Sequence, residues 1–116
     1  MKIAVPLDEN KKDVCAAFGR APFFLFEENG KEEVLGNPGA SSQGGAGIKS
    51  AQFLVDQKAT DLITFRCGEN AAEVFRLADM EIYKARSTDA REQLSLLKEG
   101  KLEKLTQFHA GYHGLR

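Results

Sequence analysis

The sequence predicts an α/β domain built on a mixed five-stranded sheet. Three observations support this prediction: the chain length, a hairpin turn, and the order of β-rich and helical segments. The chain has 116 residues, of which 42% are hydrophobic and 28% charged, so it is long enough to bury one core. Asn29-Gly30 is a strong two-residue hairpin signal. After it, strands and helices alternate, which predicts parallel strands joined by helical crossovers.

The first third of the chain predicts three strands. Residues 3–5 form a short apolar run that Pro6 closes. Residues 23–28 are rich in aromatic side chains, and the turn at 29–30 joins them to an antiparallel partner at 32–35. Charged residues crowd this hairpin, so we expect it at an edge of the sheet.

The rest of the chain predicts three helices with two short strands between them. The predicted strands are 62–65 and 82–83. Thr88 is the expected N-cap of the third helix, and Gly100 is its expected end. The predicted buried helical faces are Ile48, Ala51, Leu54 and Val55; then Ala71, Val74, Phe75 and Ala78; and finally Ala90, Leu94 and Leu97.

Composition and charge narrow the class of partner. The chain carries 16 basic and 17 acidic residues, a formal net charge of -1, which disfavours nucleic acid. No stretch approaches the ~18 apolar residues of a membrane span, and the start turns polar at Asp8, too early for a signal peptide. Two cysteines are too few for a disulfide framework. We therefore expect a cytoplasmic protein with reduced thiols and no membrane or nucleic-acid partner.

A glycine-rich segment is the first candidate binding element. Residues 37–47 contain four glycines, one proline and two serines, and no large apolar side chain, which predicts a flexible loop inside the domain. Its end, Gly44-Gly45-Ala46-Gly47, directly precedes a predicted helix, where free N–H groups attract anions. The segment is either a cradle for an anionic cofactor or a mobile entry to a helix. It has neither dinucleotide-binding nor P-loop spacing.

Two cysteines are candidate ligands for a soft metal. Cys67 follows a predicted strand and precedes a helix, at the end of the sheet where α/β proteins bind ligands. We expect the helix start and Arg66 to lower the pKa of its thiol, although a buried, inert cysteine is the alternative. Cys15 follows the first strand and is expected near the same edge. Two thiolates would suit Cu(I), zinc or an iron–sulfur cluster.

The remaining polar candidates favour binding over catalysis. Arg20 follows a glycine at a predicted loop end, where a guanidinium suits a carboxylate or the charge of a cluster, unless it is a solvated surface arginine. His109 and His113 fall in a segment expected to be a loose, exposed tail. No histidine is arranged beside a nucleophile, and the first strand lacks the acidic residues of a two-metal nuclease. The sequence therefore predicts that the protein is not an enzyme.

Five short motifs follow one another in a recognisable order. They are Met1-Lys2-Ile3-Ala4-Val5-Pro6, Phe18-Gly19-Arg20-Ala21-Pro22-Phe23-Phe24, Asn37-Pro38-Gly39, Gly44-Gly45-Ala46-Gly47 and Gly68-Glu69-Asn70-Ala71-Ala72. In this order, the motifs resemble the dinitrogenase iron–molybdenum cofactor-binding family, and the chain looks like a small stand-alone member of it. The resemblance spans about residues 1–105, and we expect residues 106–116 to be a C-terminal tail.

The resemblance implies a ribonuclease H-like, three-layer α/β/α fold without nuclease activity. It also implies a nitrogenase accessory protein that binds, carries or inserts an iron–molybdenum or other metal–sulfur cluster. Implied partners are proteins that donate and accept the cluster, and we expect a monomer or weak homo-oligomer. The residues expected to hold the cluster are Arg20, Gly44, Gly45, Ala46, Gly47, Gly68 and Asn70, with Cys67 and Cys15 as metal ligands.

Two positions depart from the pattern that the family leads us to expect. Many members carry a histidine just before Phe-Gly-Arg, where this chain has Ala17, and many have an aliphatic residue where it has Cys67. If that histidine is the usual ligand of the cluster in the family, either this chain has lost the ligand or Cys15 and Cys67 replace it. The alternative function is therefore a protein–protein or regulatory module that keeps the fold without binding a cluster.

Overall fold

Five strands form one mixed sheet in the computed structural model, which describes residues 1–109. In the order β3-β2-β1-β4-β5, β1 pairs antiparallel with β2 and parallel with β4, β2 pairs antiparallel with β3, and β4 pairs parallel with β5. The strands are β1 (Lys2–Leu7), β2 (Phe23–Glu28), β3 (Lys31–Gly36), β4 (Asp61–Thr64) and β5 (Glu81–Lys84). The predicted mixed five-stranded sheet is confirmed.

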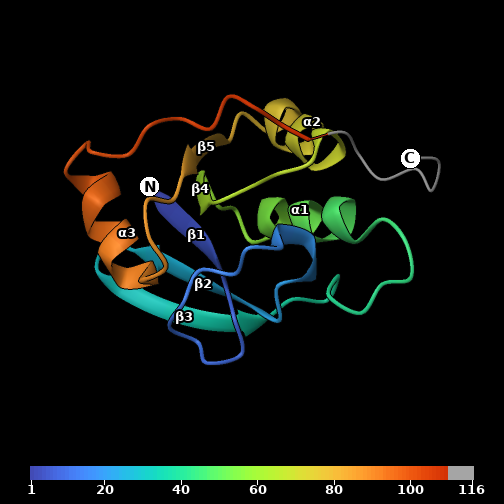
Figure 1. The fold of residues 1–116 in the computed structure, drawn as a ribbon, viewed down its shortest axis with the longest axis horizontal. Helices are drawn as coiled ribbons and strands as arrows, with labels where there is room; N and C mark the ends of the chain where they lie inside the picture. Colours follow the sequence, from blue (N-terminus) through green and yellow to red (C-terminus); the bar gives the residue numbers. More distant parts are fainter. Residues whose placement is uncertain (110–116) are drawn as a thin grey trace.

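Helices cover both faces of this sheet, as Figure 1 shows. The helices α1 (Ala46–Asp56) and α2 (Glu69–Leu77) pack on one face, and α3 (Ala90–Lys98) packs on the other. Side chains alternate along a strand, so Ala4 of β1 joins the core beneath α1 and α2 while Ile3 joins the core beneath α3. The three-layer α/β/α arrangement is thus confirmed, whereas the ribonuclease H-like label stays an implication of the resemblance.

Pro6 lies inside β1 instead of closing it. The residue pairs with Phe24 of β2, and its carbonyl accepts a hydrogen bond from the backbone N–H of Cys15 at 2.8 Å. The N–H and C=O of one strand residue point to the same side of the strand. The N–H that proline lacks would therefore face the Cys15 loop and not β2, so the antiparallel ladder loses no hydrogen bond.

The starts and ends of the helices account for the wrong predictions of burial. Ile48 is 44% exposed although its spacing predicts a buried position. It lies in the first turn of α1 and lines the cleft described below. Ala78 is exposed because it is the C-cap of α2. Farther along the helices, Leu54 and Phe75 are buried as predicted.

Asp89, and not Thr88, is the N-cap of α3. Its carboxylate accepts a hydrogen bond from the backbone N–H of Glu92 at 3.0 Å, which is the bond that favours aspartate at this position. The cap predicted from the sequence was therefore wrong by one residue. Gly100 follows the helix end with φ of +74°, as the predicted C-terminal signal requires.

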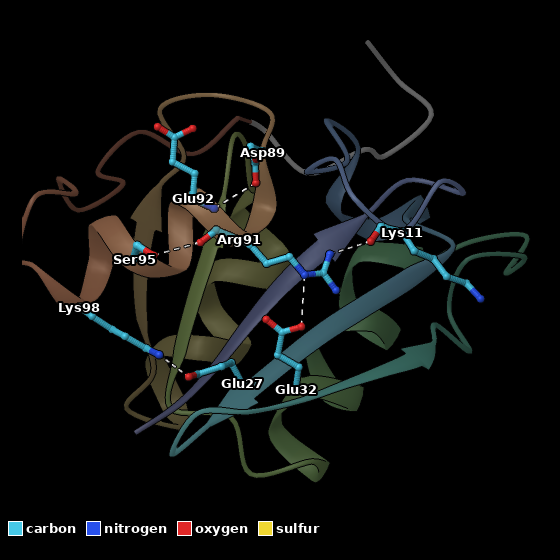
Figure 2. Close-up of polar contacts among 8 residues, drawn as sticks. All are labelled: Lys11, Glu27, Glu32, Asp89, Arg91, Glu92, Ser95 and Lys98. Atoms are coloured by element: carbon cyan, nitrogen blue, oxygen red, sulfur yellow. Dashed lines mark hydrogen bonds and ion pairs between the residues drawn. The ribbon is translucent and has the colours of Figure 1, made fainter.

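Polar side chains tie α3 to the hairpin of β2 and β3, as Figure 2 shows. Arg91 donates to the carboxylate of Glu32 at 3.2 Å and to the backbone carbonyl of Lys11 at 2.9 Å. Lys98 pairs with Glu27, a carboxylate residue that is only 4% exposed. The charged side chain of Glu32, in the hairpin predicted to lie at an edge of the sheet, therefore also helps to hold α3 in place.

The C-terminal segment runs from α3 along β5 and α2 (Figure 1). Leu105 donates its N–H to Ile82 of β5 at 2.9 Å, and both Leu105 and Phe108 pack against the core beneath α1 and α2. His109 is hydrogen-bonded through its backbone, so the prediction that it belongs to a loose tail is wrong. His113 lies outside the described residues, and the boundary predicted at residue 105 stays a prediction. Within the described residues, no helix has the length and apolar character needed to cross a bilayer.

Candidate functional site

A cleft of about 590 Å³ lies beyond the carboxyl ends of β1 and β4. Four segments form its wall: the turn after β1, the first turn of α1 with the residues before it, the turn from β4 into α2, and His109. The lining residues are Ala16, Ala17, Phe18, Gly19, Arg20, Gln43, Gly44, Gly45, Ala46, Gly47, Ile48, Arg66, Cys67, Gly68, Asn70, Ala71 and His109. Apart from Cys15, the residues predicted to bind a cluster or metal thus surround one cleft.

Two helices start at this cleft, and neither start is capped by a side chain. The N-cap of α1 is Gly45, whose φ of +67° lies in the left-handed region that favours glycine, and the N-cap of α2 is Gly68. By contrast, α3 on the other face of the sheet is capped by Asp89. The first N–H groups of a helix point outward with partial positive charge. The cleft therefore lies where two helix starts attract an anion.

The charged side chains in the lining add to this positive potential. Arg20 and Arg66 are both in the wall, and the described lining contains no aspartate or glutamate. Arg20 also donates to the backbone carbonyl of Ala40 at 3.1 Å and to that of Ser42. The guanidinium consequently fixes the outer loop of the cleft while keeping its charge at the site.

A short 3₁₀ turn, η1 (Phe18–Arg20), packs directly on the first turn of α1. A Cβ atom on Gly19 would lie 2.9 Å from both the Cα and the N of Gly47, so this position needs a glycine. Phe18 anchors the turn in the core, with its ring centroid 5.7 Å from that of Phe24 and 5.6 Å from that of Phe75. The Phe-Gly-Arg motif therefore places Arg20 beside the start of α1.

A buried polar network holds the glycine-rich loop and was not foreseen from the sequence. The side-chain amide of Asn37 donates to the carbonyl of Ala21 and to Ser50 Oγ, both at 2.9 Å, and its oxygen accepts the N–H of Gly39 at 2.9 Å. Ser50 Oγ in turn donates to the carbonyl of Gly19 at 2.9 Å. The first part of this loop is therefore anchored. The Asn-Pro-Gly sequence is a turn signal that could have indicated it.

Burial governs the chemistry of Cys67. The residue is 1% exposed, its Sγ donates to the carbonyl of Gly68 at 3.5 Å, and desolvation raises the pKa of the thiol to about 12. The prediction that the helix start and Arg66 lower this pKa is therefore wrong. The cause of the raised pKa is the loss of hydration of the charged form on burial.

Cys15 lies outside the lining of the cleft. It is 8% exposed, and its Sγ donates to the carbonyl of Ala17 at 3.6 Å. Burial also raises the pKa of this thiol, although the hydrogen bond to Ala17 opposes the effect. Within residues 1–109, no three His, Cys, Asp or Glu side chains gather as a metal site. The pairing of Cys15 with Cys67 as metal ligands stays a prediction.

His109 is a member of the site that the sequence did not indicate. Its backbone N–H donates to the carbonyl of Cys67 at 3.3 Å, and its carbonyl accepts the N–H of Glu69 at 2.9 Å. Its imidazole lies against Gly68, where a Cβ atom would be only 3.1 Å from Cε1. The C-terminal segment thus brings an imidazole to the turn between β4 and α2.

The fold and the site define a class: a three-layer α/β/α protein with an anion-attracting cleft between two helix starts. Residues 1–100 match the dinitrogenase iron–molybdenum cofactor family, and the chain belongs to that family. Membership associates the protein with binding or biosynthesis of this cofactor, in an accessory role.

Relatives and solved structures agree with this assignment. An uncharacterised protein of Methanocaldococcus jannaschii is 34% identical over 109 residues, which cover 90% of this chain and 91% of the relative. A proposed NifB protein from Thermotoga has a TM-score of 0.77 at 31% identity, with 92% of this chain and 95% of that chain covered. The apo form of the orange protein from Desulfovibrio gigas has a TM-score of 0.83 and covers 90% of this chain and 92% of its own. At 24% identity it shows the fold alone.

Proposed function

We propose that this protein is a non-enzymatic carrier that holds a preformed, anionic metal–sulfur cluster in the cleft and passes it to an acceptor protein. The observation that supports the proposal is the concentration of positive potential at one place. Two helix starts without side-chain caps meet Arg20 and Arg66 around a cleft whose described lining has no carboxylate. Family membership points to the same class of cargo.

The donors around the cleft suit a preformed cluster better than a bare metal ion. A bare ion takes several thiolates, imidazoles or carboxylates as ligands. No three such side chains gather within the described residues, and Cys67 is buried as a neutral thiol. A preformed cluster brings its own sulfides, which accept hydrogen bonds from N–H groups, and a negative charge, which guanidinium groups stabilise. Backbone N–H groups and arginines are among the hydrogen-bond donors that this cleft offers.

The shape of the cleft suits reversible carriage. Its inner wall includes the buried residues Ala46 and Cys67, whereas residues 43–45 at its outer wall are exposed. A cluster held against the inner wall would keep one side accessible to a partner protein. The partners that follow from this role are proteins that donate and accept the cluster.

An anaerobic titration with tetrathiomolybdate, a preformed molybdenum–sulfur dianion, tests the proposal. We expect saturable binding in the visible absorption of the complex. Replacing Arg66 with alanine should weaken binding about tenfold, because a charge-assisted contact is worth about 1.5–3 kcal/mol. The matched control is Arg76→Ala, since Arg76 lies on α2 outside this cleft and pairs with Glu73.

Two outcomes of this titration contradict the proposal. Wild-type protein without affinity for tetrathiomolybdate would favour the alternative of a regulatory or protein–protein module that binds no cluster. Equal losses for the Arg66 and Arg76 variants would place the anion somewhere other than the cleft.

A further inference from the structure

We propose that His109 is a metal ligand for the cargo, with its imidazole coordinating an iron or another first-row transition metal at the edge of the cluster. This inference rests on the proposed function, because it assumes that a cluster occupies the cleft. It assigns a role to the C-terminal segment, which lies beyond the residues 1–100 that match the family.

The backbone fixes His109 at the wall of the cleft. Its N–H donates to Cys67 and its carbonyl accepts from Glu69, at 3.3 and 2.9 Å. These two bonds attach the residue to both sides of Gly68, with which it forms a parallel bridge. The position of the imidazole is therefore set by the same turn that carries the start of α2.

The segment before His109 is anchored too, so the imidazole does not depend on a loose chain. Lys104 forms a bridge with Tyr83 of β5, and Leu105 donates to the carbonyl of Ile82 at 2.9 Å. Leu105 and Phe108 pack against the core that α1 and α2 cover. A ligand held in place before binding loses less conformational freedom when the metal arrives.

Gly68 leaves room for the imidazole ring. A Cβ atom at this position would lie 3.1 Å from Cε1 of His109 and 3.6 Å from each ring nitrogen. The ring occupies the space that a side chain at residue 68 would take. His109 is exposed and lines the cleft, so a cluster inside it can reach the ring.

The chemistry of the lining makes His109 the preferred donor. Imidazole nitrogen suits iron, copper and zinc, whereas guanidinium groups carry no lone pair for a metal. Cys67 is 1% exposed, and the described lining contains no carboxylate. The arginines and helix starts attract the charge of the cluster, and His109 adds one coordinate bond to its metal.

The test compares two probes under anaerobic conditions: tetrathiomolybdate alone, and its adduct with Fe(II). The variants are His109→Gln and, as a control, Gln107→Ala, because Gln107 is an exposed residue of the same segment outside the lining of the cleft. We expect His109→Gln to weaken binding of the iron adduct at least about tenfold, the size of effect seen when a metal site loses a supporting group. Binding of tetrathiomolybdate alone should change less than about threefold, and Gln107→Ala should affect neither probe.

A second measurement reads the ring directly. In protein labelled with ¹⁵N-histidine, Fe(II) in the bound adduct should broaden the imidazole signals of His109, which are identified by their absence from the spectrum of His109→Gln. Gly68→Ala, which displaces the ring while keeping the imidazole, should weaken adduct binding by an intermediate factor. These readouts do not depend on transfer activity.

The outcomes separate this inference from the proposed function. Wild type that binds neither probe would overturn both. Binding of tetrathiomolybdate, with an adduct affinity that His109→Gln leaves unchanged, would overturn only the role of His109. Imidazole signals of His109 that stay sharp in the bound adduct would overturn it as well.

Discussion

Gly44 and Gly45 are adjacent glycines with different requirements. Gly45 is the N-cap of α1 and has φ of +67°, whereas Gly44 has no positive φ and a Cβ atom on it would meet nothing within 4 Å. The open space around Gly45 shows that its requirement comes from the backbone conformation and not from packing. A run of glycines in a sequence does not show which member carries such a requirement.

Gly45→Ala should therefore lower the free energy of unfolding by about 1 kcal/mol, the cost of placing an L-residue in the left-handed region. Gly44→Ala is the matched control and should change it by less than about 0.5 kcal/mol. Urea denaturation of both variants measures the difference. Equal effects would show that the conformation of Gly45 does not limit α1.

The buried thiol of Cys67 predicts low reactivity. With a pKa raised to about 12, the group stays a neutral thiol at pH 8, and the thiolate is the nucleophilic form. Between about pH 8.5 and pH 12, the Cys67 thiol keeps its proton in the folded protein, whereas an ordinary cysteine of the unfolded chain loses it. The contribution of Cys67 to stability is therefore present below about pH 8.5 and is lost as pH rises toward 12.

Labelling with a disulfide reagent at pH 8, followed by mass spectrometry, measures this reactivity. Native protein should react at Cys67 far more slowly than protein in denaturant, where both cysteines should label. Rapid labelling of Cys67 in the native protein would contradict its burial and restore the reactive-thiol interpretation.

At the scale of elements, periodicity predicts which helical face is buried but not how far the sheet extends beneath it. Leu54 and Phe75 are buried as their spacing indicates, while Ile48 belongs to the same helical pattern and is exposed. Its turn borders the cleft, where Ile48 is part of the lining. The N-cap of α3 was predicted at Thr88 but is Asp89. Both residue types can cap a helix, so residue type alone does not distinguish the two positions.

The network around Asn37 connects three elements: η1, the glycine-rich loop and α1. Asn37→Ala would leave the N–H of Gly39 and the carbonyl of Ala21 without their side-chain partner. Each buried group that loses its hydrogen bond costs about 1–3 kcal/mol. Two such groups give an expected fall in the free energy of unfolding of about 2–6 kcal/mol, measured by urea denaturation.

Ser50→Ala is the partial version of this change. It removes one of the acceptors for the Asn37 amide while keeping the bonds to Ala21 and Gly39. We expect a smaller loss, of about 1 kcal/mol. A larger loss for Ser50→Ala than for Asn37→Ala would show that Asn37 does not organise the loop.

At the scale of the whole molecule, strand order accounts for the part of the site that the sequence predicts. The carboxyl ends of parallel neighbouring strands lie at one edge of a sheet. The turns after β1 and β4 therefore had to meet, which brings Arg20 to Cys67 and Gly68. The entry to α1 joins them because η1 packs on its first turn.

The features that could not be predicted depend on long-range packing. His109 reaches the cleft because the C-terminal segment pairs with the edge of β5 and ends beside Gly68, and no local pattern near residue 109 indicates this course. The pKa of Cys67 depends on the core that surrounds it, which a neighbouring arginine in the sequence does not reveal.

The central claim is that an anionic metal–sulfur cluster binds between the starts of α1 and α2. Its most direct test is a crystal structure with tetrathiomolybdate, in which anomalous scattering at the molybdenum edge locates the metal. We predict a strong molybdenum peak inside the cleft, between the backbones of Gly45 and Gly68 and beside Arg66. An empty cleft at saturating tetrathiomolybdate, or a peak bound only elsewhere on the surface, would contradict the claim.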